Sequence, residues 1–129
     1  MSAESRKIIR EIYQAQANRN IEAVLALCDP AAEVEQTELL PWGGHYSGHK
    51  GLLDFLTRLG AFVESLPQPM HFIEAGNRLA VTGRLRGRVK SNGNEFDLNM
   101  VHVWTVRDGK ATRFEAYIDT PGMLRALAG

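Results

Sequence analysis

Asp119 is the side chain whose position most invites a catalytic interpretation. It follows "RFEAYI", where polar and apolar residues alternate as in a strand, and it precedes "TPG", which is typical of a helix start. A carboxyl group at that junction can act as a general acid or base if partial burial raises its pKa. It can also order the final helix, although Thr120 is itself a suitable N-cap and Pro121 suits the first helical position. The sequence leaves both roles open.

The turn-rich stretch "LLPWGGHYSGHKG" also carries side chains suited to binding. Trp42 and His45 flank Gly43-Gly44, so this loop either gates the mouth of a pocket or anchors itself by packing. The four histidines share no spacing typical of metal ligands, and no phosphate-binding glycine loop or dinucleotide fingerprint occurs. We therefore expect no metal and no nucleotide cofactor.

The composition excludes several classes of partner. Lys plus Arg and Asp plus Glu both number 15, so no net charge attracts nucleic acid or a membrane surface. The single cysteine, Cys28, allows no internal disulfide, and we predict it as a buried thiol on the apolar side of a helix. No apolar run reaches the ~18 residues of a membrane span, and "MSAESRKIIREI" lacks the apolar core of a signal peptide. We expect a cytoplasmic protein.

Helical patterns come first along the chain and strand patterns follow. After "PQP", apolar residues recur at every second position, as in strands, and no longer at helical spacing. Asn92-Gly93 and Asp108-Gly109 are hairpin signals within this region. This order predicts a single α+β domain over residues 1–129. The expected helices lie within 2–20, 20–30, 49–66 and 120–129, and the expected strands at 31–38, 70–75, 78–90, 94–106 and 111–119.

The first hairpin predicts two distinct sheet faces. A two-residue turn at Asn92-Gly93 places Arg84 opposite Val101. The mixed face then carries Arg84, Arg86, Arg88, Asp97, Asn99, Val101 and Val103, and the apolar face carries Leu85, Val89, Phe96, Leu98, Met100, His102 and Trp104.

The second hairpin allows two registers. A two-residue turn at Asp108-Gly109 places Asp119 opposite Leu98, within the apolar set. A three-residue loop over 107–109, with Gly109 left-handed, places it beside Tyr117 on the mixed face with Asn99. We prefer the three-residue loop because it separates polar from apolar residues and gives the apolar face Phe114, Ala116 and Ile118.

The helices can cover only one face of this sheet. If they cover the mixed face, they enclose a pocket with polar groups. In that case the apolar face meets a second copy of the chain. In the other case the apolar face packs on the helices. We therefore predict a homodimer through Met100, His102, Trp104 and Phe114.

The order of elements, with "PWGGHYSGHKGLLDFL" and the closing "VHVWTVRDGKATRFEAYID", resembles the nuclear-transport-factor-2-like superfamily and most of all its SnoaL-like branch. The resemblance implies a cone-shaped α+β barrel. In such a fold, about three N-terminal helices pack on a curved, mostly antiparallel sheet and enclose a deep cavity. It also implies frequent dimerisation through the outer sheet face.

The resemblance places several residues at known functional positions. Tyr13 stands where ketosteroid isomerase has its oxyanion-hole tyrosine, Gln36 where it has its general base, and Val101 where it has its second oxyanion donor. An amide accepts no proton at neutral pH and valine donates none, so we do not expect steroid-isomerase chemistry. Asp119 resembles the late-strand aspartate of limonene-epoxide hydrolase and of polyketide cyclases. Arg84 matches the hydrolase's arginine, but Arg86 replaces its acid-donating aspartate.

We therefore expect a cavity protein for an apolar, cyclic small molecule. It is either a cofactor-independent isomerase, cyclase or hydrolase with Asp119 as acid or base, or a non-catalytic ligand-binding or protein-interaction domain. The expected binding residues are Tyr13, Gln36, Trp42, His45, Arg84, Asn99, Val101 and Tyr117.

Overall fold

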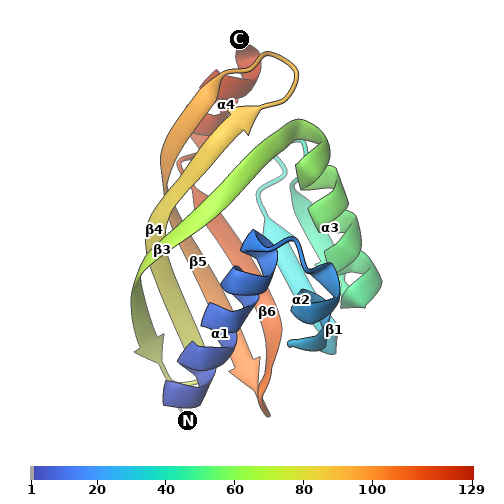
Figure 1. Ribbon diagram of the computed structural model, residues 1–129, viewed down its shortest axis with the longest axis vertical. Helices are drawn as coiled ribbons and strands as arrows, with labels where there is room; N and C mark the ends of the chain where they lie inside the picture. The colour runs from blue at the N-terminus through green and yellow to red at the C-terminus, as the bar shows by residue number, and fades with distance from the viewer. Residues whose placement is uncertain (1) are drawn as a thin grey trace.

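A curved sheet of six strands forms the body of the computed structural model, which describes residues 2–129 (Figure 1). The strand order is β2-β1-β6-β5-β4-β3, and all neighbours are antiparallel except β1 and β6. The helices are α1 (Ser2–Ala17), α2 (Ile21–Ala26), α3 (Gly48–Phe62) and α4 (Thr120–Ala128). The strands are β1 (Cys28–Gln36), β2 (Gly44–Ser47), β3 (Val63–Ala75), β4 (Arg78–Val89), β5 (Glu95–Arg107) and β6 (Lys110–Ile118).

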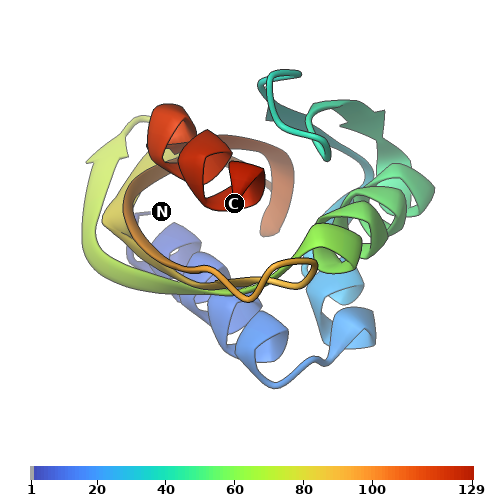
Figure 2. The same cartoon turned by 90° about the horizontal axis from the view of Figure 1, so that it is seen from above.

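The predicted α+β class and the mostly antiparallel curved sheet are confirmed. Figure 2 shows the strands following an arc, with α1, α2 and α3 beside it, and Figure 1 shows α4 at one end of the molecule. The sheet is not closed into a barrel, because β2 and β3 remain as its two edges.

Helix α1 presents one apolar stripe to the sheet. Ile8, Ile9, Ile12 and Tyr13 recur at helical spacing and are all buried. At its solvent side Arg10 lies over the ring of Phe72 in β3, 4.8 Å from the ring centre. No helix within residues 2–129 combines the length and the apolar character needed to cross a membrane.

Two boundaries differ from those predicted. Helix α3 ends at Phe62 and Val63 is already extended, so residues 63–66 belong to β3 rather than to a helix. Pro67 and Pro69 have no backbone N–H to donate. They are tolerated there because β3 is an edge strand, which has no neighbouring strand on one side to accept such a bond. Cys28 begins β1 instead of lying on α2; it is buried as predicted, and burial raises the pKa of its thiol to about 11.

The β4–β5 hairpin has a longer loop than predicted. The Val89 N–H donates to the Asn94 carbonyl at 2.8 Å, which leaves residues 90–93 as the loop. Arg84 consequently lies opposite Asn99 and not opposite Val101. This shift of two residues leaves every side chain on its predicted face.

The β5–β6 hairpin has a tight turn followed by a bulge. Asp108 and Gly109 form a two-residue turn with φ of 50° and 75°, and Arg107 pairs with Lys110, so the preferred three-residue loop is wrong. The register then shifts by one between Thr105 and Val106. The bulge thus gives the same separation of faces that the three-residue loop predicted.

The helices cover the apolar face of the sheet, contrary to expectation. Leu98, Met100, His102 and Trp104 are all buried within the chain, whereas Val101 between them is 37% exposed. Covering the apolar face removes more apolar area from water than covering the mixed face. The apolar face is therefore concave, and the predicted dimer contact through Met100, His102, Trp104 and Phe114 is wrong, because the first three are buried within the chain and Phe114 packs against the core.

Candidate ligand-binding cavity

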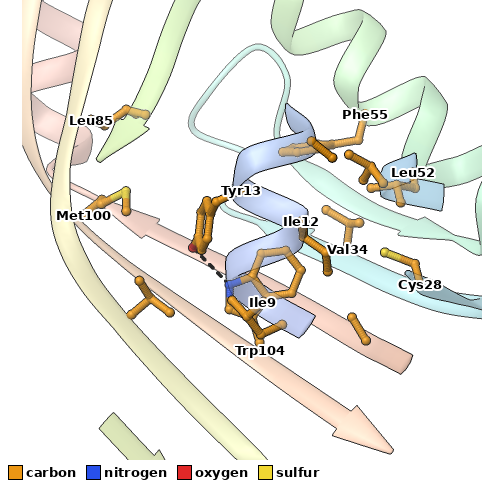
Figure 3. Packing of buried hydrophobic residues seen from close by; sticks show 14 of the residues in the cluster. Ile9, Ile12, Tyr13, Cys28, Val34, Leu52, Phe55, Leu85, Met100 and Trp104 are labelled. Atoms are coloured by element: carbon orange, nitrogen blue, oxygen red, sulfur yellow. Dashed lines mark hydrogen bonds between the residues drawn. The ribbon is translucent and has the colours of Figure 1, made fainter. Parts of the chain in front are cut away.

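A cavity of about 70 Å³ lies between the helices and the concave face of the sheet. Its walls are mostly apolar, and Figure 3 shows side chains from α1, α3 and the strands converging on this region. Lining residues include Ile12 from α1, Leu52 and Phe55 from α3, Val34 from β1, and Phe114 and Ile118 from β6.

Three polar side chains form a hydrogen-bonded relay in the cavity wall. The Trp104 indole Nε1 donates to the Tyr13 hydroxyl oxygen at 3.0 Å (Figure 3), and that oxygen lies 2.7 Å from Nδ1 of His102. An indole N–H only donates, and Nδ1 is the one acceptor within reach of the hydroxyl proton among the described residues. Tyr13 therefore donates to Nδ1, which places the imidazole proton on Nε2.

Burial keeps this relay uncharged. His102 is 5% exposed, and desolvation lowers its pKa to about 3, so the imidazole is neutral at pH 7. Desolvation is also the main cause that raises the pKa of Tyr13 above its usual value, against the opposing hydrogen bond from Trp104. The relay presents hydrogen-bond dipoles rather than net charge.

Gln36 and Trp42 form a second polar pair in the wall. The Trp42 indole donates to Oε1 of Gln36 at 3.0 Å, and the Tyr46 hydroxyl donates to the Trp42 carbonyl at 2.9 Å. Trp42 is 1% exposed, so the loop between β1 and β2 is anchored by packing, one of the two roles the sequence left open.

A surface groove meets the cavity at the end of β1 and β6. Gln36, Ala116 and Ile118 line both spaces, and the groove continues past His45 and Tyr117.

The remaining predicted binding residues lie on the convex face. His45 pairs with Glu33 at 2.7 Å, and Arg84 binds Asp97 at 2.8 Å and Asn99 at 2.5 Å. Val101 and Tyr117 point to solvent, with exposures of 37% and 54%. Of the expected binding residues, the cavity brings together Tyr13, Gln36 and Trp42.

Asp119 is the N-cap of α4. Its Oδ1 accepts from the Gly122 N–H at 3.0 Å, so it has the role that the sequence analysis gave to Thr120. Its side chain is exposed and does not line the cavity. Strand β6 ends at Ile118, so Asp119 lies just beyond the sheet.

His102 and Trp104 are cavity residues that were not predicted as such. Their alternation within an apolar strand predicts a structural or intersubunit role. A histidine and a tryptophan on a strongly apolar strand need buried partners, and Tyr13 on α1 supplies one.

The convex face carries its own network of charges. The Tyr117 hydroxyl donates to Glu115 at 2.6 Å, and Arg78 and Arg113 approach the same carboxylate at 3.1 Å and 3.3 Å. The Tyr117 hydrogen bond is the largest cause that lowers the pKa of Glu115. Across residues 2–129, no cluster of three or more His, Cys, Asp or Glu side chains has the proximity needed to hold a metal ion.

Comparison with known proteins identifies the family. The model of the SnoaL-like domain matches residues 9–114, and the chain belongs to this family. An NTF2-like protein of unknown function from Burkholderia pseudomallei is 31% identical, with 98% of each chain covered and a TM-score of 0.91. TerC, crystallised with polyporic acid, is 31% identical over 98% of this chain and 99% of its own, with a TM-score of 0.90.

More distant structures share the fold alone. A protein from Xanthomonas campestris described as a putative polyketide cyclase is 18% identical over 97% of each chain, with a TM-score of 0.84. No curated protein sequence matches this chain. The resemblance to the SnoaL-like branch of the NTF2-like proteins is thereby confirmed.

Proposed function

We propose that this chain binds a small, largely apolar molecule that carries an oxygen acceptor, and that Nε2–H of His102 is the donor it meets. The observation that carries the proposal is the buried neutral imidazole in the cavity wall. Its Nδ1 is occupied by Tyr13, while Nε2 has no protein partner among residues 2–129.

The energetics of an unpaired donor favour an oxygen-bearing ligand. A hydrogen bond from Nε2–H to a carbonyl oxygen in the cavity contributes about 0.5–1.5 kcal/mol, so the site favours a ligand that carries such an oxygen. The bonds from Trp104 to Tyr13 and from Tyr13 to His102 run in the same direction, so each polarises the next toward the ligand. The co-crystallisation of TerC with polyporic acid supports a ligand that carries oxygen.

Catalysis by this cavity is the second candidate function. A neutral imidazole N–H can stabilise an oxyanion that develops on a bound carbonyl, as required of a cofactor-independent isomerase or cyclase. The acid or base role of Asp119 stays a prediction, and its position as an exposed helix cap argues against it. Binding is the function we favour.

A matched pair of ligands tests the role of the oxygen. Cyclohexanone and methylenecyclohexane have similar shapes, but only the ketone accepts a hydrogen bond. The two tryptophans of the chain, Trp42 and Trp104, both line the cavity, so their indole N–H resonances in ¹⁵N-labelled protein report binding directly.

We expect cyclohexanone to shift the Trp104 resonance through the relay. Replacing His102 by Phe should weaken ketone binding about tenfold and leave methylenecyclohexane binding within twofold. Equal ketone affinity in both proteins would contradict the role of His102. Polyporic acid is the second probe, with the same variant as control.

Dimerisation is a separate proposal, now placed on the convex face. Leu66, Ile73, Val101 and Tyr117 are exposed there by 37–56%. Exposed apolar side chains on a sheet face favour contact with another protein surface, and a second copy is the partner we propose.

A further inference from the structure

We infer that Tyr13 sets the specificity of the cavity: its hydroxyl holds the His102 imidazole in the form that donates from Nε2, so a ligand that can only donate finds no partner there. This inference rests on the proposed function and adds the residue that determines its specificity. Tyr13 acts through His102 and is therefore a positioning residue.

A neutral imidazole has two forms, which offer a ligand opposite partners. With the proton on Nε2 the ring donates from that atom, and with the proton on Nδ1 the bare Nε2 accepts. Burial lowers the pKa of His102 to about 3, so the ring is neutral at pH 7 and has one of these two forms. The hydrogen bond at the other ring nitrogen decides between them.

The hydrogen bonds of the Tyr13 hydroxyl select the form with the proton on Nε2. Trp104 Nε1 donates to the hydroxyl oxygen at 3.0 Å, and an indole nitrogen cannot accept the hydroxyl proton in return. Nδ1 of His102, 2.7 Å from the same oxygen, is the acceptor that remains for this proton. A proton on Nδ1 would aim two N–H groups at one oxygen and leave the hydroxyl proton unpaired.

The Nδ1–H form is disfavoured by more than one ligand bond restores. An unpaired buried donor lowers the population of that form by a factor of roughly ten or more, whereas a new hydrogen bond to Nε2 gains a factor of about five. A donor-only ligand therefore leaves the tautomer unchanged and binds without a hydrogen bond to His102. An acceptor ligand meets a donor that is already in place.

Nε2 of His102 is open to the cavity. Within residues 2–129, Arg6 Nε is the single buried side-chain nitrogen or oxygen that has neither a hydrogen-bond partner nor accessible surface. Nε2 of His102 has no protein partner either, so it must retain accessible surface, although the residue is only 5% exposed. His102 lines the cavity and not the outer groove, so a ligand in the cavity can reach this atom.

The ring nitrogens of His102 report the tautomer directly. NMR of protein with ¹⁵N-labelled histidine identifies the nitrogen that carries the proton, and the His102 signals are those missing from His102→Phe. Pyrrole donates one N–H and has no lone pair to accept a bond. We expect the His102 proton on Nε2 in the free wild type, and it should stay there in excess pyrrole.

Tyr13→Phe should allow the cavity to take a donor as well. Nδ1 then has no fixed partner, so pyrrole can select the Nδ1–H form and donate to Nε2. Thiophene has a ring of similar shape without the N–H, and its affinity measures any change in packing. We expect Tyr13→Phe to raise the affinity for pyrrole about fivefold relative to thiophene, with the imidazole proton moving to Nδ1.

A purely structural role of Tyr13 would give a different result, because a loosened cavity changes the affinities for both rings alike. Tyr117→Phe removes the same hydroxyl group from an exposed ring on the convex face. It should leave the ratio of the two affinities within twofold of the wild-type ratio.

The outcomes distinguish this inference from the function on which it rests. If cyclohexanone binds the wild type and His102→Phe equally, the proposed function is wrong. If cyclohexanone binding needs His102 but pyrrole gains nothing over thiophene in Tyr13→Phe, the donor site stands and the role of Tyr13 is wrong. A proton that moves to Nδ1 when pyrrole is added to the wild type would also overturn that role, whether or not the variant folds.

Discussion

His102 links the chemistry of the cavity to the stability of the fold. Its folded-state pKa of about 3 lies below the ~6.5 of an unfolded histidine, so the unfolded chain binds a proton that the folded chain excludes. The contribution of this residue is fully present above pH ~6.5 and is lost as the pH falls toward 3. A single buried histidine therefore makes the protein sensitive to acid.

We expect the free energy of unfolding to fall by about 1.4 kcal/mol per pH unit below pH 6 through this residue alone. Urea unfolding of the wild type and of His102→Phe, measured from pH 7 to pH 4, isolates this contribution because the variant has no imidazole to protonate at position 102. The difference in the free energy of unfolding between the two proteins should narrow as the pH falls. A His71→Phe control, at an exposed position, should follow the wild type. A constant gap would show that His102 becomes protonated while folded.

The Tyr13 hydroxyl should contribute more to stability than an exposed hydroxyl does. Tyr13→Phe leaves Trp104 Nε1 without its acceptor and His102 Nδ1 without its donor. We expect a loss of about 1–3 kcal/mol in the free energy of unfolding, measured with urea. Tyr117→Phe, whose ring is 54% exposed, should lose under about 1 kcal/mol. Equal losses would argue against the relay.

At the scale of elements, the sequence predicted faces more accurately than registers. Arg84 was paired with Val101, two residues from its observed partner Asn99, and Val106 was paired with Lys110, one residue from its observed partner Ala111. The bulge adds a second residue to the latter difference, so the faces were right for both hairpins. An alternating pattern specifies which side of a strand is apolar, but it is unchanged by a shift of two. The position of the bulge beside Thr105 does not follow from the pattern, because alternation along each strand does not show where an extra residue enters the pairing.

The cap of α4 gives a test of the role of Asp119. Asp119→Ala removes the acceptor for the Gly122 N–H and should reduce stability by about 1 kcal/mol, whereas Asp119→Asn keeps an acceptor and should change it little. Thermal unfolding measures both. Neither variant should alter cyclohexanone affinity by more than twofold. A large loss of affinity in the folded Asp119→Asn variant would restore the functional role that the sequence suggested.

Gly83 allows β3 to approach β4 closely at the bend of the sheet. A Cβ at this position would lie 2.1 Å from the Gln68 carbonyl oxygen of β3. Gly83→Ala should therefore destabilise the protein by about 1–3 kcal/mol, the usual penalty of overpacking. Gly60→Ala in α3, where no atom lies within 4 Å of the added Cβ, should instead stabilise it by about 0.5–1 kcal/mol. Chemical denaturation of the two variants compares these opposite effects, and a stable Gly83→Ala protein would contradict the close approach.

At the scale of the whole molecule, the two sheet faces have separate roles. The concave face combines an apolar wall with the hydrogen-bonded relay of Trp104, Tyr13 and His102, while the convex face carries paired charges around Glu115. Composition and patterning predicted both faces but not which one the helices cover. That choice depends on how α1 and α3 meet the sheet, and on the burial of Tyr13 against His102, which joins residues 89 positions apart.

The convex face should determine the oligomeric state. We expect the wild type to have twice the chain mass of 14.4 kDa in size-exclusion chromatography with light scattering. Val101→Glu places a charge at the centre of this face, and a twofold contact would bring it near its own copy, so this variant should be a monomer. Leu53→Glu, at an exposed position on α3, should remain a dimer. A monomeric wild type, or a dimeric Val101→Glu, would show that the convex face does not join two copies.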